Sequence, residues 1–214
     1  FSDFSLSHNR EKIKELASGQ LKDEANAWFV GEPFKVFYDY KKEGIWQLGE
    51  EATAAANGQE PGDIKVQDVD GNGVITTDDR IIYSQRPDVT FGFNNTFNYK
   101  GFDLSVFLYA RLGQWIAYDY NTTYRINALE NGGNVDYWTP ENPTNAFPRP
   151  NKSKSYTQVT YYSTLKYEDG SFFKIRDITL GYTFKPELLK HLNLSRLRVY
   201  ATAKNFFTFS KIDN

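Results

Sequence analysis

The hydrophobic and polar positions alternate most regularly between residues 91 and 112, in two consecutive runs. Apolar side chains, mostly aromatic in the first run, occupy every second position of residues 91–99 and again of residues 102–110. Because successive side chains of a β-strand point to opposite faces, each run predicts a strand with one apolar and one mostly polar face. Lys100 and Gly101 between the runs leave room only for a tight hairpin turn. Each strand is about ten residues long, which suits a tilted crossing of a bilayer better than a soluble sheet.

Weaker alternation predicts further strands, which lie in residues 1–8, 34–40, 171–184 and 197–204. Residues 9–21 are expected to form a short helical turn or a polar connection, and residues 50–62 a loop. The connections differ greatly in length, and the longest are residues 47–88 and 113–170. Short turns on one side and long loops on the other are typical of transmembrane β-barrels. About six strands are too few to close such a barrel, since the smallest have about eight.

Composition agrees with a β-rich chain and excludes several other classes. Of the 214 residues, 17% are aromatic, which suits strands and the aromatic girdles of barrels. No apolar run approaches the length of a transmembrane helix, and the mean hydropathy is -0.61. A net charge of -2 argues against a nucleic-acid partner. Without cysteine there is no disulfide framework and no thiolate ligand. Phe1 is not an initiator and the given sequence does not open with a signal peptide, so we expect a mature or processed chain or a fragment.

Residues 68–79 carry the sharpest chemical signal, because their sequence DVDGNGVITTDD matches the calcium loop of the EF-hand type. Oxygen ligands are expected at loop positions 1, 3, 5, 7, 9 and 12, with glycine at position 6. The loop departs from the pattern at position 12, where an aspartate replaces the usual glutamate. No flanking helices are evident, so a structural calcium or magnesium ion is expected rather than a calcium sensor. The alternative is a cluster of Asx turns without an ion. The expected ligands are Asp68, Asp70, Asn72, the carbonyl of Val74, Thr76 and Asp79.

The long segment 113–170 is rich in aromatic residues that suit either ligand stacking or packing of the loop upon itself. No nucleophile elbow, phosphate loop or HExxH motif is present. The adjacent acids Glu168 and Asp169 are more simply solvated turn residues than glycosidase acids. We therefore expect no enzyme activity and no catalytic residues. The candidate ligand-binding residues are Trp115, Tyr118, Tyr124, Tyr137 and Trp138.

A series of short motifs follows in order along the chain. The motifs are PGDIK at 61–65, DVDGNGVI at 68–75, Asp79-Arg80, FGFNN at 91–95, GFDLS at 101–105, YWTPENP at 137–143, EDGSF at 168–172, DITLGY at 177–182, LRVY at 197–200 and NFFT at 205–208. Together they resemble the SusC/RagA family of TonB-dependent outer-membrane transporters of Bacteroidetes. The resemblance covers nearly the whole chain, which is similar to the C-terminal barrel portion of such a transporter, without its plug domain and TonB-box region.

The resemblance implies that residues 1–214 are a segment of a large plugged β-barrel in the outer membrane of a Gram-negative cell. It also implies energy supplied through TonB, a SusD-like surface lipoprotein as partner, and import of glycans or peptides. Segments 47–88 and 113–170 are then expected to be external loops. We expect lipid to contact Phe102, Leu104, Val106, Leu108 and the apolar side of 197–203, and the lumen to contact Ser105, Arg198, Tyr200 and Thr202. The alternative is a soluble, calcium-stabilised β-sandwich that binds carbohydrate.

Overall fold

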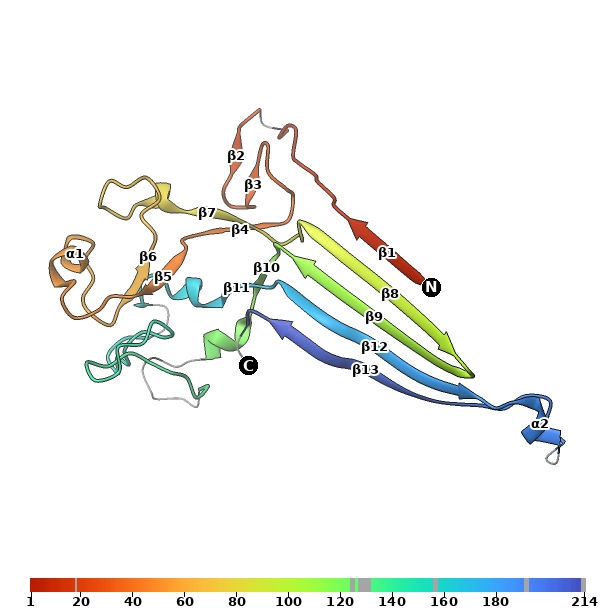
Figure 1. Ribbon diagram of the computed structural model, residues 1–214. Coiled ribbons are helices and arrows are strands. Elements are labelled where there is room, and N and C mark those ends of the chain that lie inside the picture. The colour runs from red at the N-terminus through yellow and green to blue at the C-terminus, as the bar shows by residue number, and fades with distance from the viewer. Residues whose placement is uncertain (18, 124–125, 127–131, 156–157, 191–192, 213–214) are drawn as a thin grey trace. The chain divides into compact units, whose positions relative to one another are not determined.

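The computed structural model describes all residues except 18, 124–125, 127–131, 156–157, 191–192, 213 and 214 (Figure 1). The chain divides into two compact units. Residues 1–12, 84–115 and 169–214 form what we call the sheet unit. Residues 13–83 and 116–168 form the loop unit. No helix in the described part of the chain is long and apolar enough to cross a membrane.

The sheet unit is a single five-stranded sheet in the order β1-β8-β9-β12-β13, with every neighbouring pair antiparallel (Figure 1). Four strands are 11 to 13 residues long, which agrees with the length expected from the sequence. No closed barrel is formed by the described residues, because β1 and β13 are the two edges of this sheet. The strands are β1 (Ser2–Ser7), β8 (Val89–Tyr99), β9 (Phe102–Leu112), β12 (Phe172–Thr183) and β13 (Arg198–Ser210), with α2 (Pro186–Leu189) between the last two.

The predicted central hairpin is confirmed, with β8 and β9 paired from Val89↔Leu112 to Tyr99↔Phe102. Its turn consists of Lys100 and Gly101, whose φ angles are 47° and 92°. Positive φ at both central residues defines the type I′ turn, which matches the right-handed twist of the flanking strands. Glycine is required at the second position because a Cβ there would lie 2.8 Å from the carbonyl oxygen of Thr183.

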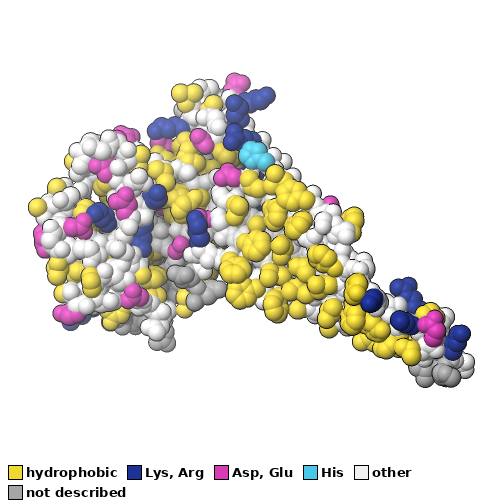
Figure 2. Space-filling view, viewed as in Figure 1, with side chains coloured by type: hydrophobic (Ala, Val, Ile, Leu, Met, Phe, Trp, Pro, Cys, Tyr) yellow, Lys and Arg dark blue, Asp and Glu magenta, His cyan; other side chains and the backbone are white. Residues whose placement is uncertain are grey.

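One face of the sheet is apolar across all five strands. Figure 2 shows this face as a continuous hydrophobic surface over the strands. Several of its large side chains are more than half exposed, among them Phe102 at 54% and Leu180 at 52%. The strand register brings the predicted lipid-facing residues of β9 into line with apolar residues on both neighbouring strands. Examples are Phe97↔Leu104↔Leu180↔Ala201 and Phe93↔Leu108↔Ile175↔Phe207, whereas Val106 has apolar Ile178 on β12 but polar Asn95 on β8.

The opposite face is polar and carries the residues predicted to face the lumen. Arg198 on β13 reaches across β12 and donates two hydrogen bonds to the Asp103 carboxylate on β9, at 3.0 and 2.5 Å. Gly181 lies beneath this ion pair, where a Cβ would come within 2.6 Å of Arg198 Nη2 and 2.7 Å of both Asp103 oxygens. The glycine therefore gives the ion pair the space to join three strands.

The loop unit is made of short elements around a compact core. The core contains Ile45, Ile64, Val66, Trp138, Tyr162 and Leu165, all less than 9% exposed. Two-stranded sheets pair β2 with β3, β4 with β7, β5 with β6 and β10 with β11. The chain passes between the two units near β7, β10 and β11. The elements are β2 (Lys22–Asp23), β3 (Trp28–Phe29), β4 (Val36–Asp39), β5 (Lys42–Ile45), α1 (Glu51–Ala56), β6 (Ile64–Val66), η1 (Thr77–Asp79), β7 (Ile81–Ser84), β10 (Trp115–Ala117), η2 (Asp119–Thr123), η4 (Tyr162–Lys166) and β11 (Tyr167–Asp169).

Two sequence expectations need correction, and one is decided between its alternatives. Segment 50–62 is not only a loop, because its alanine-rich start forms α1, as the high helix propensity of alanine favours. Segment 9–21 is a connection and not a helical turn in its described residues, and Ile13 forms a parallel bridge with Val30. The last strand extends beyond residue 204 to Ser210. Asn205, at a φ of 49°, lies in a register shift that interrupts the alternation and so hides this extension.

Candidate functional site

The loop at 68–79 brings three of its predicted ligands together within the loop unit. One carboxylate oxygen each from Asp68, Asp70 and Asp79 lies within 4.8 Å of the others. Asp70 is exposed, Asp68 is half-buried and Asp79 is fully buried, so the cluster extends from the surface to the base of the loop. Three carboxylates this close repel one another unless a cation or hydrogen-bond donors compensate them.

Asp79 at the base of the loop is held by main-chain donors from both ends of the loop. Its Oδ1 accepts a hydrogen bond from the N–H of Val69 at 2.8 Å, and its Oδ2 accepts one from the N–H of Thr76 at 2.7 Å. The Thr76 hydroxyl accepts from the N–H of Asp78 at 3.2 Å and so caps the start of η1, where Thr76 and Asp79 form a capping box. The hydrogen bond from the N–H of Thr76 is the largest contribution that lowers the pKa of Asp79. This carboxylate is therefore ionised at neutral pH.

The outer part of the loop is a series of Asx turns. Asp68 accepts from the N–H groups of Gly71 at 2.8 Å and Gly73 at 2.7 Å. Asn72 accepts from the N–H of Val74 at 2.8 Å and donates to Asp70 Oδ2 at 2.8 Å. These bonds fold the expected ligand positions into one turn. They are compatible with a bound cation and equally with the alternative of Asx turns without an ion.

Asn57, at the C-terminal end of α1, is a residue that sequence reasoning missed. Its Oδ1 accepts from the N–H of Ile75 at 2.8 Å, and its Nδ2 donates to the carbonyl oxygen of Gly73 at 3.3 Å. These two bonds hold the chain on both sides of Val74, whose carbonyl is an expected ligand. No local signal marks Asn57, because it lies sixteen or more residues before the positions that it holds.

The donor set fits a hard divalent cation. Carboxylate, amide and main-chain carbonyl oxygens are the ligands that calcium prefers, and magnesium also takes oxygen ligands. The fit rests on the three converging carboxylates, on an Asp79 kept charged by its donors, and on Gly73 with a φ of 83° at the loop's tightest bend.

The candidate ligand-binding aromatics do not form one site. Trp138 is only 4% exposed and its Nε1 donates to Gln47 Oε1 at 2.9 Å, so this ring is a core residue and is not available for ligand stacking. Tyr137 beside it is 42% exposed. Tyr118 packs against Tyr120 with ring centroids 5.9 Å apart. The remaining candidates cannot be grouped with these: Trp115 belongs to the sheet unit, and Tyr124 lies outside the described residues.

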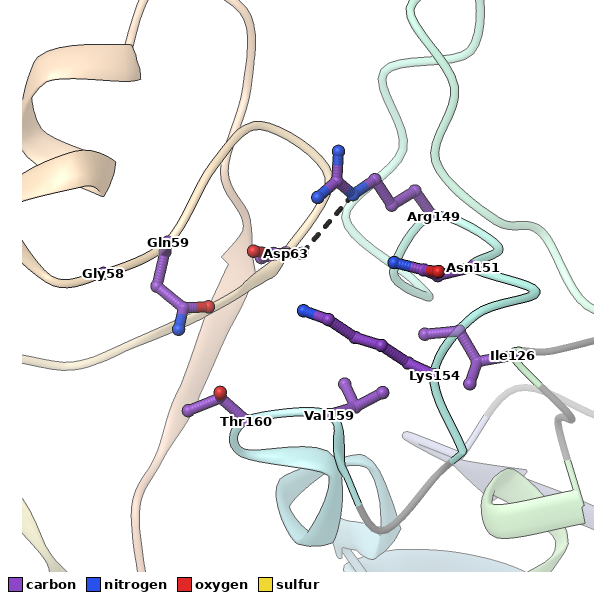
Figure 3. Close-up of a pocket in the computed structure, with 9 residues that line it drawn as sticks. All are labelled: Gly58, Gln59, Asp63, Ile126, Arg149, Asn151, Lys154, Val159 and Thr160. Carbon is purple, nitrogen blue, oxygen red and sulfur yellow. Dashed lines mark ion pairs between the residues drawn. The ribbon is translucent and has the colours of Figure 1, made fainter.

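A small polar pocket in the loop unit is a second feature that the sequence did not predict (Figure 3). Lys154 points into this pocket, with Gln59 on the facing side. Arg149 forms ion pairs with Glu60 and, at 3.4 Å, with Asp63. The pocket therefore presents hydrogen-bonding groups with nearly balanced charge. It is lined by Gly58, Gln59, Asp63, Ile126, Arg149, Asn151, Lys154, Val159 and Thr160.

Two tyrosines of the loop unit, the buried Tyr83 and the half-buried Tyr167, serve as hydrogen-bond donors. Burial raises the pKa of Tyr83 and of Tyr167, so both phenols stay protonated. Tyr83 donates to the carbonyl oxygen of Tyr40 at 2.8 Å, and Tyr167 donates to Asp39 Oδ2 at 3.2 Å. Their rings stack at 5.2 Å, which indicates a structural role for both.

Comparison with known proteins gives relatives of one class. The chain is 32% identical to TonB-dependent receptor P3 of Formosa agariphila over 97% of its length, and 31% identical to receptor P26 of that organism over 98%. It is 32% identical to TonB-dependent receptor SusC of Bacteroides thetaiotaomicron over 67% of its length. The chain spans about a fifth of the first two relatives, 22% in each case. No protein-family model matches the chain.

Solved structures agree in fold. The structure of the RagAB peptide transporter matches 99% of the chain and 24% of the transporter chain, with a TM-score of 0.69 and 22% identity. The RagAB peptide importer in its open-open state matches with a TM-score of 0.66 and 23% identity. The sheet unit and the relatives together place the chain among the TonB-dependent receptors. More narrowly, it belongs to the SusC/RagA family, as the sequence motifs indicated. These relatives are receptors and not enzymes, in agreement with the expectation of no catalytic site.

Proposed function

We propose that this chain supplies part of the barrel wall and of the external loops of a TonB-dependent importer in the outer membrane. The observation that carries the proposal is the exposed apolar face of the sheet unit, formed by long antiparallel strands in a chain of this family. In water an exposed apolar face of this kind promotes aggregation, whereas lipid hydrocarbon covers it without a free-energy penalty. A strand of 11 residues is about 36 Å long, enough for a tilted crossing of the hydrocarbon layer.

The two faces of the sheet support this placement. The apolar face containing Phe102, Leu104 and Leu180 is assigned to lipid, and the polar face containing Ser105 and Arg198 to the lumen. On the polar face, Arg198 has its carboxylate partner in Asp103, as a charge on a barrel wall requires. The free edges of β1 and β13 are proposed to pair with strands of the parent protein. A soluble β-sandwich is not supported, since the described residues contain only one sheet of more than two strands.

The partner and cargo follow from the family. We propose a SusD-like surface lipoprotein as the partner, and energy transfer through TonB by a region of the parent protein outside residues 1–214. The external positions of segments 47–88 and 113–170 stay predictions; most of both segments lies in the loop unit. The cargo class is glycan or peptide. RagAB, which shares the fold, is described as a peptide transporter, and SusC is one of the relatives with 32% identity.

The first test is made on the parent polypeptide in its native cells. We expect it in the outer-membrane fraction, migrating faster before boiling than after, because a closed barrel stays folded in detergent. We also expect a lipoprotein to co-purify with it. A polypeptide found in the soluble fraction, with one mobility before and after boiling, contradicts the proposal.

We further propose that the loop at 68–79 binds one calcium ion, or magnesium in its place, as a structural element. The proposed ligands are the carboxylates of Asp68, Asp70 and Asp79, together with oxygens of Asn72, Val74 and Thr76. The ion compensates the three carboxylates that lie within 4.8 Å of one another, and it ties the exposed turn to the buried Asp79.

Removing two of the carboxylates tests the ion site. In the parent protein, the double variant Asp68→Asn and Asp70→Asn is expected to lose the calcium bound by the loop. The readout is the protection of residues 68–80 from proteolysis by added calcium, which should be weaker in the variant. The control is Asp78→Asn, an exposed carboxylate on the same loop that is not a proposed ligand. Equal calcium protection in all three proteins contradicts a bound ion.

A further inference from the structure

The end of the sheet unit that carries the short turns is a distinct surface, which we call the turn end. It consists of the Lys100-Gly101 turn and of residues 184–190 and 193–197, the described part of the connection between β12 and β13. The N–H of Thr183 donates to the carbonyl of Gly101 at 2.8 Å, which brings the two turns together. The N–H of Phe184 donates to the carbonyl of Leu197 at 3.0 Å, so Lys185 and Arg196 leave the strands side by side.

The turn end has a strong excess of positive charge. Lys100, Lys185, Lys190 and Arg196 are all exposed, and Glu187 is the acidic residue among them. Among the described residues, no ion pair is found for these four cations. Figure 2 shows the Lys and Arg side chains gathered around α2, beside the hydrophobic surface of the strands.

Two cations at the opposite end of the same sheet are instead paired within the chain. Arg86 pairs with Glu11 at 2.6 Å, and Lys211 pairs with Asp169 at 2.6 Å. At the turn end, by contrast, all four cations lack such a partner among the described residues.

An aromatic band lies directly next to these cations on the apolar face. Tyr99, Phe102 and Tyr182 are in register on β8, β9 and β12, and the first two are 70% and 54% exposed. Phe184 continues the band, with its ring 5.0 Å from that of Tyr182. Aromatic side chains prefer the headgroup level of a bilayer, where one end is apolar and the other is wet.

We propose that the turn end binds the phosphate headgroups of glycerophospholipids in the inner leaflet of the outer membrane. The aromatic band marks the interface, and the four cations lie just beyond it, at the depth of lipid phosphates. Leu188 and Leu194, 60% and 46% exposed, add apolar contacts near the headgroups. The inference rests on the proposed function, since short barrel turns face the periplasm and the leaflet on that side consists of phospholipid.

The test measures lipid retention by the detergent-extracted parent protein, using native mass spectrometry with added phosphatidylglycerol or phosphatidylcholine. We expect tighter retention of phosphatidylglycerol, and at least a tenfold loss of that affinity when all four cations are neutralised, because each contributes severalfold at an anionic surface. The variant is Lys100→Gln, Lys185→Gln, Lys190→Gln and Arg196→Gln. The control neutralises four exposed lysines elsewhere: Lys12→Gln, Lys14→Gln, Lys35→Gln and Lys152→Gln.

The outcomes separate the lipid site from the proposed function. An outer-membrane protein that shifts on boiling, but whose phosphatidylglycerol retention is unchanged by the variant or equally reduced by the control, overturns the lipid site alone. Displacement of phosphatidylglycerol by lipid A also overturns it, because the ligand would then come from the outer leaflet. A parent protein outside the outer membrane overturns the barrel proposal itself.

Discussion

Replacing Asp79 by alanine is expected to open the loop at 68–79 and loosen the start of β7. The carboxylate is fully buried, and it accepts the N–H groups of Val69 and Thr76 from opposite ends of the loop. Without it, both donors lose their partner inside the protein, which costs at least about 2 kcal/mol. We expect the amides of residues 69 and 76 to exchange their hydrogens about 30-fold faster in the intact parent protein, measured by hydrogen exchange.

The neighbouring Asp78→Ala supplies the matched control, because Asp78 is exposed and its side chain is outside the carboxylate cluster. Acid provides a second check. The folded-state pKa of Asp79 is lowered, so its stabilisation is complete above the unfolded-state pKa and is lost as the pH falls through the folded value. Protection of the loop should therefore weaken in acid in the natural protein, but not in Asp79→Ala. Equal exchange in Asp79→Ala and Asp78→Ala contradicts this role.

The alternation of side chains was enough to predict the sheet unit but not its extent. The hairpin β8–β9 follows from period-two apolar positions and a Lys-Gly turn, both of which are local signals. The order of the strands depends on pairings between distant segments, such as Phe4↔Phe93 between β1 and β8. Sequence periodicity says which face of a strand is apolar, but it does not say which strand lies next to it.

In the candidate site, too, the local features could be predicted from the sequence, whereas contacts between distant segments could not. The spacing of Asp68, Asp70 and Asp79 is a local pattern, and the structure brings these carboxylates together as expected. The sequence did not indicate Asn57, because its bonds to Gly73 and Ile75 depend on the fold of the whole loop unit. For Trp138 the sequence left two alternatives open, ligand stacking or packing of the loop upon itself, and its burial decides for packing.

Trp138→Ala is the second change with a large expected effect. The ring is 4% exposed within the core that contains Ile45 and Ile64, and Gly62 approaches so closely that a Cβ there would lie 2.7 Å from Trp138 Cε3. Removing a buried indole costs about 3–5 kcal/mol, and Gln47 also loses the hydrogen bond from Nε1. We expect the loop unit to become sensitive to protease in the intact parent protein while the barrel still resists heat in detergent.

Tyr137→Ala is the matched control for Trp138, because it removes the adjacent aromatic ring, which is 42% exposed. A half-exposed ring contributes far less packing, so protease resistance should stay close to that of the natural protein. Uptake assays distinguish packing from ligand stacking. If Trp138→Ala leaves the loop unit resistant and abolishes only cargo binding, Trp138 contacts cargo and the core assignment is wrong. If uptake and protease resistance are lost together in Trp138→Ala alone, the indole acts by holding the loop unit in shape.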